Sequence, residues 1–315
     1  MKTLSAEDLD GIFTFENLIG ELRTAFAEGA EAPLRHQHTI SHPGGTDASL
    51  LLMPAWSTDA ASGHIGVKIV TVSPDNGAVS MPAVMASYML MNGRTGVPEA
   101  LIDGGRLTLW RTSCASALAA QFLAPPQPDT LLMVGAGELA PFLARAHAQV
   151  RNYRRILVWN RSKPGAERLA DELRAEGHNA AVAPDLDDAV ASADVISAAT
   201  LSRVPLVRGD CVTPGTHIDL VGAFRPQMRE TDDACVAKAS LFVDTYEGAI
   251  KEGGDIAQPL RDGIITKSAI RADLADLCRG NHPGRSSEEE ITLFKSTGAA
   301  LEDLAAAILA YRLAD

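Results

Sequence analysis

Hydrophobic and polar residues are arranged differently in the two parts of this chain, and the difference predicts two kinds of structure. In the first part, short apolar stretches are separated by turns rich in proline, glycine and aspartate. Such a pattern, without long helices between the stretches, is typical of a mostly antiparallel or mixed sheet. The expected strands are LRHQHTI (34–40), ASLLLMPAW (48–56), HIGVKIVTV (64–72) and EALIDGG (99–105).

Helical spacing marks three further segments of the first part. Residues 15–28 place apolar side chains three and four positions apart, which predicts a helix with one buried face. Ser5 and Asp8 have the spacing of a capping box at the start of a shorter helix. Residues 105–124 are expected to form a helix rich in small residues.

From residue 130 onward, apolar strands alternate with amphipathic helices. One such helix is KPGAERLADELRAEG (163–177), in which Leu169, Leu173 and Ala175 are expected to face inward. This alternation predicts an α/β protein, with a Rossmann-type doubly wound parallel sheet joined to an α+β domain. The expected parallel strands are TLLMVGA (130–136), RILVWNR (155–161), NAAVAP (179–184), DVISAAT (194–200), HIDLVGA (217–223) and LFVDTY (241–246).

The last segment is expected to be a single long helix over residues 290–314. Ser286 and Ser287 precede three glutamates, 288–290, and acids at a helix start interact favourably with the helix dipole. This helix should pack back on the N-terminal part of the chain. The expected domains are therefore residues 1–118 with 291–315, and residues 119–290.

Composition narrows the class of protein. Among 315 residues, 46% are hydrophobic and 22% are charged, and the net charge of −12 argues against nucleic acid as the main partner. The four cysteines (114, 211, 235 and 278) form no CxxC pair, which favours reduced thiols in a cytoplasmic protein. The opening residues contain acids where a signal peptide needs an apolar run, and no run of about 18 apolar residues predicts a membrane span.

A glycine-rich turn follows the first parallel strand and is a candidate dinucleotide site. The pattern Gly135-x-Gly137-x-x-Ala140 lets a pyrophosphate approach the backbone at a helix N-terminus. A tight turn without a ligand is the alternative, but the strand before it and the helix after it favour dinucleotide binding. The residues expected to hold the nucleotide here are Gly135, Ala136, Gly137, Glu138 and Leu139.

The end of the second parallel strand distinguishes between cofactors. NAD sites usually place an Asp or Glu there to accept a hydrogen bond from the ribose 2′-hydroxyl. This chain has Asn160, Arg161, Ser162 and Lys163 instead, which can pair with a 2′-phosphate. The sequence therefore favours NADPH, with NADH as the alternative cofactor and a solvated basic turn as the alternative without a cofactor.

Three cations occupy unusual places in the first part of the chain. Lys68 interrupts an apolar strand, Arg35 lies in another strand, and Arg111 lies in a helix of small residues. Each alone is a structural charge that needs a partner, because an unpaired buried charge is costly. Together they are candidates for binding a substrate carboxylate. His36 and His38 share a strand face, but no third ligand is evident and no metal is expected.

A series of motifs runs along almost the whole chain: LLMPAW, GVKIVTV, LIDGGRLTLWRTSCASALAA, VGAGELAP, VWNRS, ADVISAAT, PGTHIDLVGAFRPQMRE, VDTYEGAIKEGGD and FKSTGAALED. Together these motifs resemble the ornithine cyclodeaminase/mu-crystallin family, almost from end to end. The resemblance implies a homodimer joined through the N-terminal domain, which also binds substrate. It implies that Arg35, Lys68 and Arg111 hold the carboxylate of an amino or imino acid. It also places Thr200, Leu201, Val221, Gly222 and Ser296 along the nucleotide.

Within this family, two positions distinguish the chemistry. Cyclodeaminases resemble this chain but carry acids at the positions of Phe224 and Leu51, where they handle the distal amine of ornithine. The resemblance is therefore to the ketimine reductases, which reduce Δ1-pyrroline-2-carboxylate to proline or Δ1-piperideine-2-carboxylate to pipecolate. Lys68 is the expected catalytic residue, and a small cyclic imino acid is the expected substrate. The alternatives are ornithine cyclodeaminase, alanine dehydrogenase, hydroxyproline dehydratase and a non-catalytic crystallin-like NADPH-binding protein.

Overall fold

The computed structural model describes residues 1–59, 63–79 and 81–314. Close Cα packing divides the chain into two compact units, residues 1–111 with 299–315 and residues 112–298. The second unit ends at Gly298, whereas the expected domain boundary lies between residues 290 and 291. The difference arises because a strand beyond residue 291 belongs to the parallel sheet. None of the helices in the described residues is long and apolar enough to cross a membrane.

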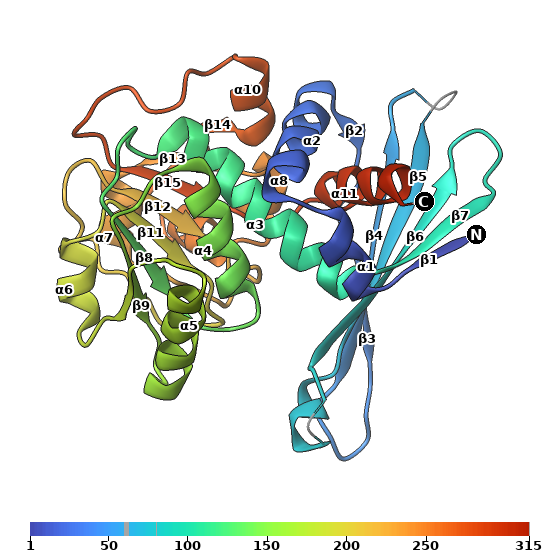
Figure 1. Ribbon diagram of the computed structural model, residues 1–315, viewed down its shortest axis with the longest axis horizontal. Coiled ribbons are helices and arrows are strands. Elements are labelled where there is room, and N and C mark those ends of the chain that lie inside the picture. The colour runs from blue at the N-terminus through green and yellow to red at the C-terminus, as the bar shows by residue number, and fades with distance from the viewer. Residues whose placement is uncertain (60–62, 80, 315) are drawn as a thin grey trace. The chain divides into compact units, whose positions relative to one another are not determined.

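The first unit is built on a seven-stranded sheet in the order β1-β7-β6-β5-β4-β2, with β3 paired to β4 (Figure 1). All pairs are antiparallel except β1 with β7, which confirms the expected mixed sheet. The strands are β1 (Lys2–Leu4), β2 (Ala30–Glu31), β3 (His36–Ile40), β4 (Ala48–Ser57), β5 (His64–Val72), β6 (Val84–Asn92) and β7 (Pro98–Asp103), and a 3-10 helix covers Pro74–Val79. β6 was not among the predicted strands.

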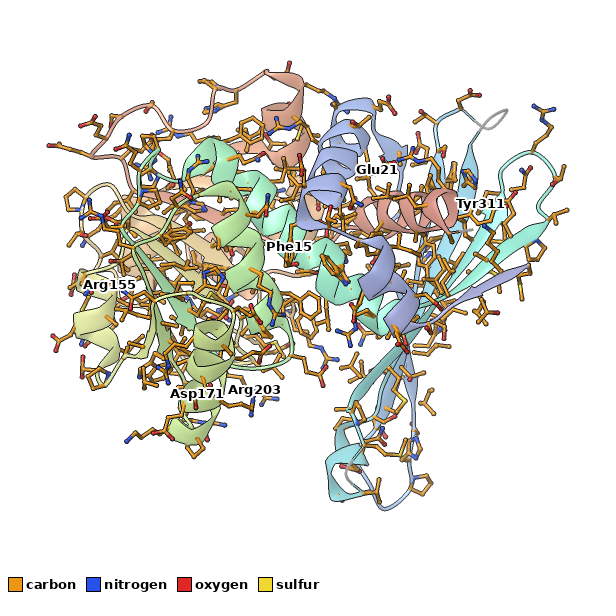
Figure 2. All side chains as sticks on the ribbon, viewed as in Figure 1. Phe15, Glu21, Arg155, Asp171, Arg203 and Tyr311 are labelled. Carbon is orange, nitrogen blue, oxygen red and sulfur yellow. The ribbon has the colours of Figure 1, made fainter. Side chains whose placement is uncertain are left out.

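Helices α1 (Ala6–Ile12), α2 (Phe15–Glu28) and α11 (Ala300–Leu313) also belong to this unit. The capping box of Ser5 and Asp8 is present at α1 as predicted. Helix α11 packs against β4, β5 and β6 and beside α2, where Arg312 Nη2 lies 2.7 Å from Glu21 Oε2 (Glu21 is labelled in Figure 2). The C-terminal helix therefore covers the sheet formed by the N-terminal strands.

The second unit contains an eight-stranded, fully parallel sheet in the order β10-β9-β8-β11-β12-β15-β13-β14. The strands are β8 (Thr130–Val134), β9 (Arg155–Trp159), β10 (Ala180–Val182), β11 (Val195–Ala198), β12 (His217–Leu220), β13 (Ser240–Val243), β14 (Ile270–Asp273) and β15 (Thr292–Lys295). The helices are α4 (Leu139–Val150), α5 (Lys163–Ala175), α6 (Leu186–Ala191), α7 (Asp233–Lys238), α8 (Tyr246–Lys251), α9 (Gly254–Arg261), the 3-10 helix Lys267–Ala269 and α10 (Leu274–Arg279). Helix α3 (Gly104–Leu123) contributes residues to both units.

Strand β8 shows why this sheet is buried on both faces. Leu131 and Met133 join a core cluster with residues of α4 and α5, whereas Leu132 and Val134 join a second cluster with residues of α6 and α7. Neighbouring residues of a strand point to opposite faces, so both clusters need apolar side chains from the same strand. The doubly wound parallel sheet predicted from the sequence is confirmed.

Two details of the sequence prediction are wrong. The expected helix over residues 290–314 is two elements, because β15 inserts between β12 and β13 and only α11 is helical. The three glutamates do not start a helix; instead Glu290 Oε2 accepts hydrogen bonds from Ser286 N and Oγ. Ala175, which was expected to face inward, is exposed at the last position of α5. The residues of α5 that face the core are Ala166, Leu169, Ala170 and Leu173.

Candidate functional site

Lys68 lies inside the first unit, on the face of β5 that α11 covers. The residue is 2% exposed, and its Nζ atom lies 2.9 Å from Asp303 Oδ1 and 2.7 Å from Oδ2. The ammonium also donates a hydrogen bond to Thr108 Oγ1 at 3.3 Å. The lysine that interrupts the apolar strand is therefore held by a carboxylate from the C-terminal helix.

Arg111 is bound to the same helix. Its Nε atom donates to Asp303 Oδ1 at 3.0 Å and its Nη1 atom donates to Glu302 Oε2 at 2.6 Å, which leaves Nη2 as the nitrogen outside these two pairs. Asp303 thus bridges Lys68 and Arg111, and both carboxylates are fully buried. Two cations and two carboxylates cancel in charge, and the half-buried Arg35 adds a further positive charge within electrostatic range of Lys68.

The environment of Lys68 favours loss of its proton near neutral pH. Burial, and next the positive charge of Arg111, lower the pKa of Lys68 to about 8, although Asp303 opposes the shift. Arg35 also lowers it. The structure therefore brings together the three cations singled out in the sequence, and places one of them in the pKa range of proton-transfer groups.

Tyr88 is a buried polar group that was not predicted. It lies opposite Lys68 in the register of β5 and β6, is fully buried, and its hydroxyl has no hydrogen-bond partner within the described part of the chain. Its ring lies over Gly66, where a Cβ atom would come within 1.8 Å of the hydroxyl. Burial, and then the charge of Asp303, raise the pKa of Tyr88, so the phenol stays neutral.

The predicted glycine turn is built in the second unit between β8 and α4. Gly135 has φ +108°, and a Cβ atom there would lie 2.8 Å from Ala199 O, so a glycine is required by backbone conformation and by space. A Cβ atom at Gly137 would meet nothing within 4 Å. Glu138 occupies the N-cap position of α4 without a side-chain hydrogen bond, so the first N–H groups of the helix have no cap from it. Ala136 is buried, and Leu139 is half-buried at the helix start.

This geometry fits a bound phosphate group. Open space at Gly137 lies beside the N-terminus of α4, which is the arrangement that binds anions through backbone N–H groups. The basic turn follows β9, where Asn160 Nδ2 donates to Ser162 O at 2.9 Å. Arg161, Ser162 and Lys163 are exposed, and Lys163 pairs with Glu167 at 3.5 Å.

Thr200 and Gly222 follow neighbouring strands, β11 and β12, and share a carboxylate that sequence reasoning missed. Glu230 Oε1 accepts from Thr200 N and Oγ1, and Glu230 Oε2 accepts from Gly222 N. Val221 is buried, whereas Leu201 is 69% exposed. Glu230 thus joins the loops after β11 and β12. Because all strands of the sheet are parallel, these loops lie at the same edge of the sheet as the glycine turn.

The loop after β15 is held by another carboxylate. Ser296 is buried, and its N–H donates to Leu220 O at 3.0 Å. Asp244 Oδ2 accepts from Thr297 N and Gly298 N at 2.6 and 2.7 Å. The residues that the sequence assigned to the nucleotide on β11, β12 and β15 therefore all occupy carboxyl ends of parallel strands, where ligands bind in open α/β sheets.

Other candidate residues occupy ordinary places. His36 and His38 are exposed on β3, and no group of three or more metal-binding side chains was found among residues with a described position. Leu51 is buried in β4. Phe224 is half-buried, with the Arg225 guanidinium 5.7 Å from its ring centroid.

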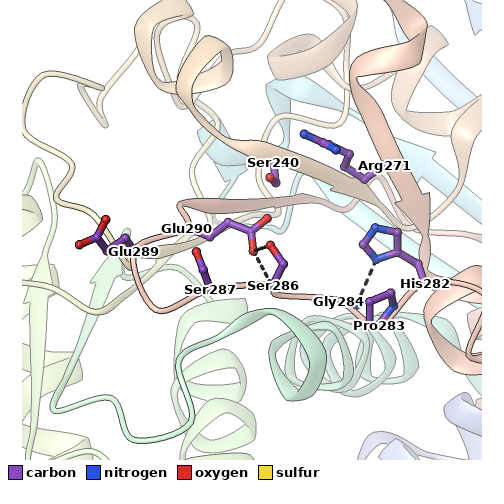
Figure 3. Close-up of a pocket in the computed structure, with 9 residues that line it drawn as sticks. All are labelled: Ser240, Arg271, His282, Pro283, Gly284, Ser286, Ser287, Glu289 and Glu290. Atoms are coloured by element: carbon purple, nitrogen blue, oxygen red, sulfur yellow. Dashed lines mark hydrogen bonds between the residues drawn. The ribbon is translucent and has the colours of Figure 1, made fainter.

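A polar cavity in the second unit lies away from these loops (Figure 3). Ser240 and Arg271 stand near the amino ends of β13 and β14, so the cavity is at the edge of the sheet opposite the glycine turn. Its His282 ring accepts a hydrogen bond from Gly284 N and packs edge-on against Phe242. The cavity is therefore separate from the candidate nucleotide site.

The parallel sheet with its glycine turn defines a dinucleotide-binding protein of the Rossmann type. A model described as the ornithine cyclodeaminase/mu-crystallin family matches residues 2–314, and the chain belongs to this family. The Δ(1)-pyrroline-2-carboxylate reductase of Colwellia psychrerythraea is 34% identical over 98% of this chain and 97% of the relative. The ketimine reductase mu-crystallin of Mus musculus is 33% identical over 98% of this chain and 96% of the relative.

A solved structure agrees along the whole chain. Thermococcus litoralis Δ(1)-pyrroline-2-carboxylate reductase, in complex with NADH and L-proline, matches with a TM-score of 0.93 and 34% identity. The match covers 99% of this chain and 97% of the other. The resemblance stated from the sequence motifs is confirmed.

The two glycines of the turn should respond differently to alanine. Gly137→Ala should leave the free energy of unfolding nearly unchanged, because its Cβ meets nothing, but should weaken dinucleotide binding at least tenfold by filling the space beside the helix N-terminus. Gly135→Ala should lower stability, because of the positive φ and the clash with Ala199 O. Calorimetric titration and urea unfolding check both; unchanged binding by the Gly137 variant would contradict the site.

Proposed function

We propose that this chain is an oxidoreductase that uses a nicotinamide cofactor to reduce a cyclic ketimine, Δ1-pyrroline-2-carboxylate to proline or Δ1-piperideine-2-carboxylate to pipecolate. The observation that supports it most is the buried pair of Lys68 and Arg111, which Glu302 and Asp303 hold in place, with the half-buried Arg35 within electrostatic range of Lys68. Cations fixed in this way can pair with the carboxylate of the substrate. Family membership and the reductases among its relatives support the same reaction.

Each cation has a role in this proposal. Arg111 offers Nη2 to the substrate carboxylate, and Arg35 contributes its charge from the segment before β3. Lys68 holds a proton on Nζ, with Asp303 stabilising the ammonium, and passes it to the imine nitrogen so that the carbon becomes a better electrophile. A bound nicotinamide supplies the hydride that this carbon accepts. Positioning by fixed cations accounts for much of the rate.

The remaining family reactions fit the chain less well. Ornithine cyclisation needs a group that binds and deprotonates the distal ammonium, and Phe224 and Leu51 provide only apolar surface at the two positions concerned. A non-catalytic binding protein would not need the buried cations. Alanine dehydrogenase and hydroxyproline dehydratase remain competing activities for the same assay.

The direct test measures oxidation of NADPH and NADH with both cyclic imines, together with ammonia release from ornithine. Imine reduction without ammonia release is the expected result. Ammonia release at a comparable rate would show that another residue replaces the missing acids, and the assignment within the family would be wrong. Absence of imine reduction with either ring size, while alanine or hydroxyproline is converted, would assign the chain to those reactions.

NADPH is the proposed cofactor because of the basic turn after β9. Arg161→Ala should raise KM for NADPH, by an amount equivalent to roughly 1.5–3 kcal/mol for a lost charged hydrogen bond, and leave KM for NADH nearly unchanged. Steady-state kinetics with both cofactors check this. Equal losses with both would show that Arg161 does not contact a 2′-phosphate.

Substrate binding should depend on pH through Lys68. Because the pKa of this lysine is lowered to about 8, the ammonium is lost as pH rises through that value. Inhibition by pyrrole-2-carboxylate, which keeps one negative charge throughout, should weaken by roughly tenfold per pH unit above the pKa. Lys68→Arg should keep inhibition constant over this range, and Lys68→Met should weaken it at every pH. A wild-type inhibition constant that does not change up to pH 9.5 would contradict the role of Lys68.

A homodimer joined through the first unit belongs to the same proposal. Ile69 and Met85 are 42% and 40% exposed on β5 and β6, in positions that alternate with the inward-facing Lys68 and Tyr88. Ile69→Glu should convert the dimer into single chains when mass is measured in solution. Ile264→Glu, at a residue 44% exposed in the second unit, is the matched control and should leave the mass unchanged. A dimer that survives Ile69→Glu would place the interface elsewhere.

Cytoplasmic location completes the proposal. All four cysteines are free thiols, which fits a reducing compartment. Fractionation of cells that express the tagged chain checks it, and recovery from an oxidising compartment would contradict it.

A further inference from the structure

Glu230 connects two loops of the parallel sheet through both of its carboxylate oxygens. Oε1 accepts from Thr200 N at 2.6 Å and from Thr200 Oγ1 at 2.9 Å. Oε2 accepts from Gly222 N at 2.7 Å and from Ala223 N at 3.2 Å. Thr200 follows β11 and Gly222 follows β12, and these two strands are direct neighbours. One side chain therefore fixes the ends of both.

The two loops touch each other at the point where Glu230 holds them. A Cβ atom on Gly222 would lie 1.9 Å from Thr200 O and 2.2 Å from Thr200 N, so the two backbones are in contact and only glycine fits. A shift of one loop must therefore move the other. Glu230 is the group that satisfies the N–H donors at this contact, and unpaired buried N–H groups are costly.

The charge of Glu230 is itself supported by a buried pair. Lys295, at the end of β15, has its Nζ 3.9 Å from Glu230 Oε2 and 3.0 Å from Asp255 Oδ2, and all three side chains are fully buried. Asp255 Oδ1 in turn accepts from the backbone N–H groups of Glu230 and Thr231, at 2.7 and 3.1 Å. Asp255 thus fixes the backbone of Glu230, and Lys295 balances one of the two negative charges.

We propose that Glu230 is a positioning residue for the cofactor, which holds the loops after β11 and β12 in the conformation that binds the nucleotide. This rests on the proposed function, in which Thr200, Leu201, Val221 and Gly222 belong to the cofactor site. Glu230 does not contact the reacting atoms in this proposal. It acts through the backbone of the two loops, and its loss weakens nucleotide binding more than turnover.

Proton uptake should have the same effect as removing the charge. Burial raises the pKa of Glu230 to about 7; Lys295 from β15 opposes the rise and Asp255 from α9 adds to it. A protonated carboxyl group adds a donor among four N–H and O–H donors, so it cannot accept from all of them. Nucleotide affinity of the wild-type protein is therefore expected to fall as pH decreases through about 7.

The test compares Glu230→Gln with the wild-type protein by calorimetric titration of NADPH and NADH from pH 6 to 8.5. The variant should bind at least tenfold more weakly at pH 8 and should lose the pH dependence, while kcat at saturating cofactor changes less than threefold. Glu230→Asp keeps the negative charge, but its shorter side chain moves the carboxylate oxygens away from their donors. Its nucleotide affinity should lie between that of the wild-type protein and that of Glu230→Gln. If Glu230→Gln does not fold, Glu230→Asp decides: weaker nucleotide binding at pH 8 with kcat changed less than threefold supports the proposal, and wild-type affinity overturns it.

Asp194→Asn is the matched control. Asp194 Oδ2 accepts from the backbone N–H groups of Asp129 and Thr130, both at 2.8 Å, at the opposite edge of the same sheet. This variant should be less stable in urea but bind the nucleotide normally. Wild-type affinity in Glu230→Gln, or an equal loss in Asp194→Asn, would show that the carboxylate is only structural and overturn the proposal. A wild-type protein that binds neither nucleotide would overturn the cofactor site itself, and the proposal with it.

Discussion

A buried cation needs a negative partner where it lies, and in this chain that requirement brings together segments far apart in the sequence. Moving an ion out of water costs several kcal/mol unless a counter-charge and hydrogen bonds replace the solvent. Among the residues that the structure describes, the carboxylates that pair with Lys68 and Arg111 are Glu302 and Asp303 of the C-terminal helix. The return of α11 to the N-terminal sheet is therefore as much an electrostatic necessity as a hydrophobic one, and removal of Asp303 would leave the Lys68 ammonium without its ion pair.

The cost of an unpaired buried charge also bears on the proposed binding of an anionic substrate beside Lys68 and Arg111. A set of two cations and two carboxylates is neutral and already satisfied, so it would bind no further charge by itself. Arg111 nevertheless keeps its Nη2 atom outside its two ion pairs, and Arg35 lies within electrostatic range of Lys68. Cations that are held by ion pairs before a ligand arrives need little reorganisation to bind a carboxylate, which is the role proposed for Arg111 and Lys68.

Most of the fold could be predicted because strands and helices differ in period. The parallel strands β8 to β13 and the antiparallel strands β3, β4, β5 and β7 follow local apolar patterns that need no knowledge of their neighbours. β15 could not be recognised, because TLFK is four residues long, ends in a lysine and follows three acids that resemble a helix start. Lys295 is acceptable in a fully buried strand only because Asp255 and Glu230 lie beside it, and neither is near in sequence.

Partners that are distant in sequence were even harder to predict at the candidate site. Lys68 and Arg111 were visible in the sequence because a charge within an apolar pattern is unusual, whereas Glu302 and Asp303 were not, since acids in the first turn of a helix are ordinary. A signal was nevertheless present, because two adjacent acids begin a helix, ALEDLAAAILA, that is otherwise almost wholly apolar. A helix that is apolar all round is buried, and its acids must then be buried with it. Since buried charges must balance, an unexplained cation in one apolar segment and an unexplained acid in another predict a contact between the two, even when more than two hundred residues separate them.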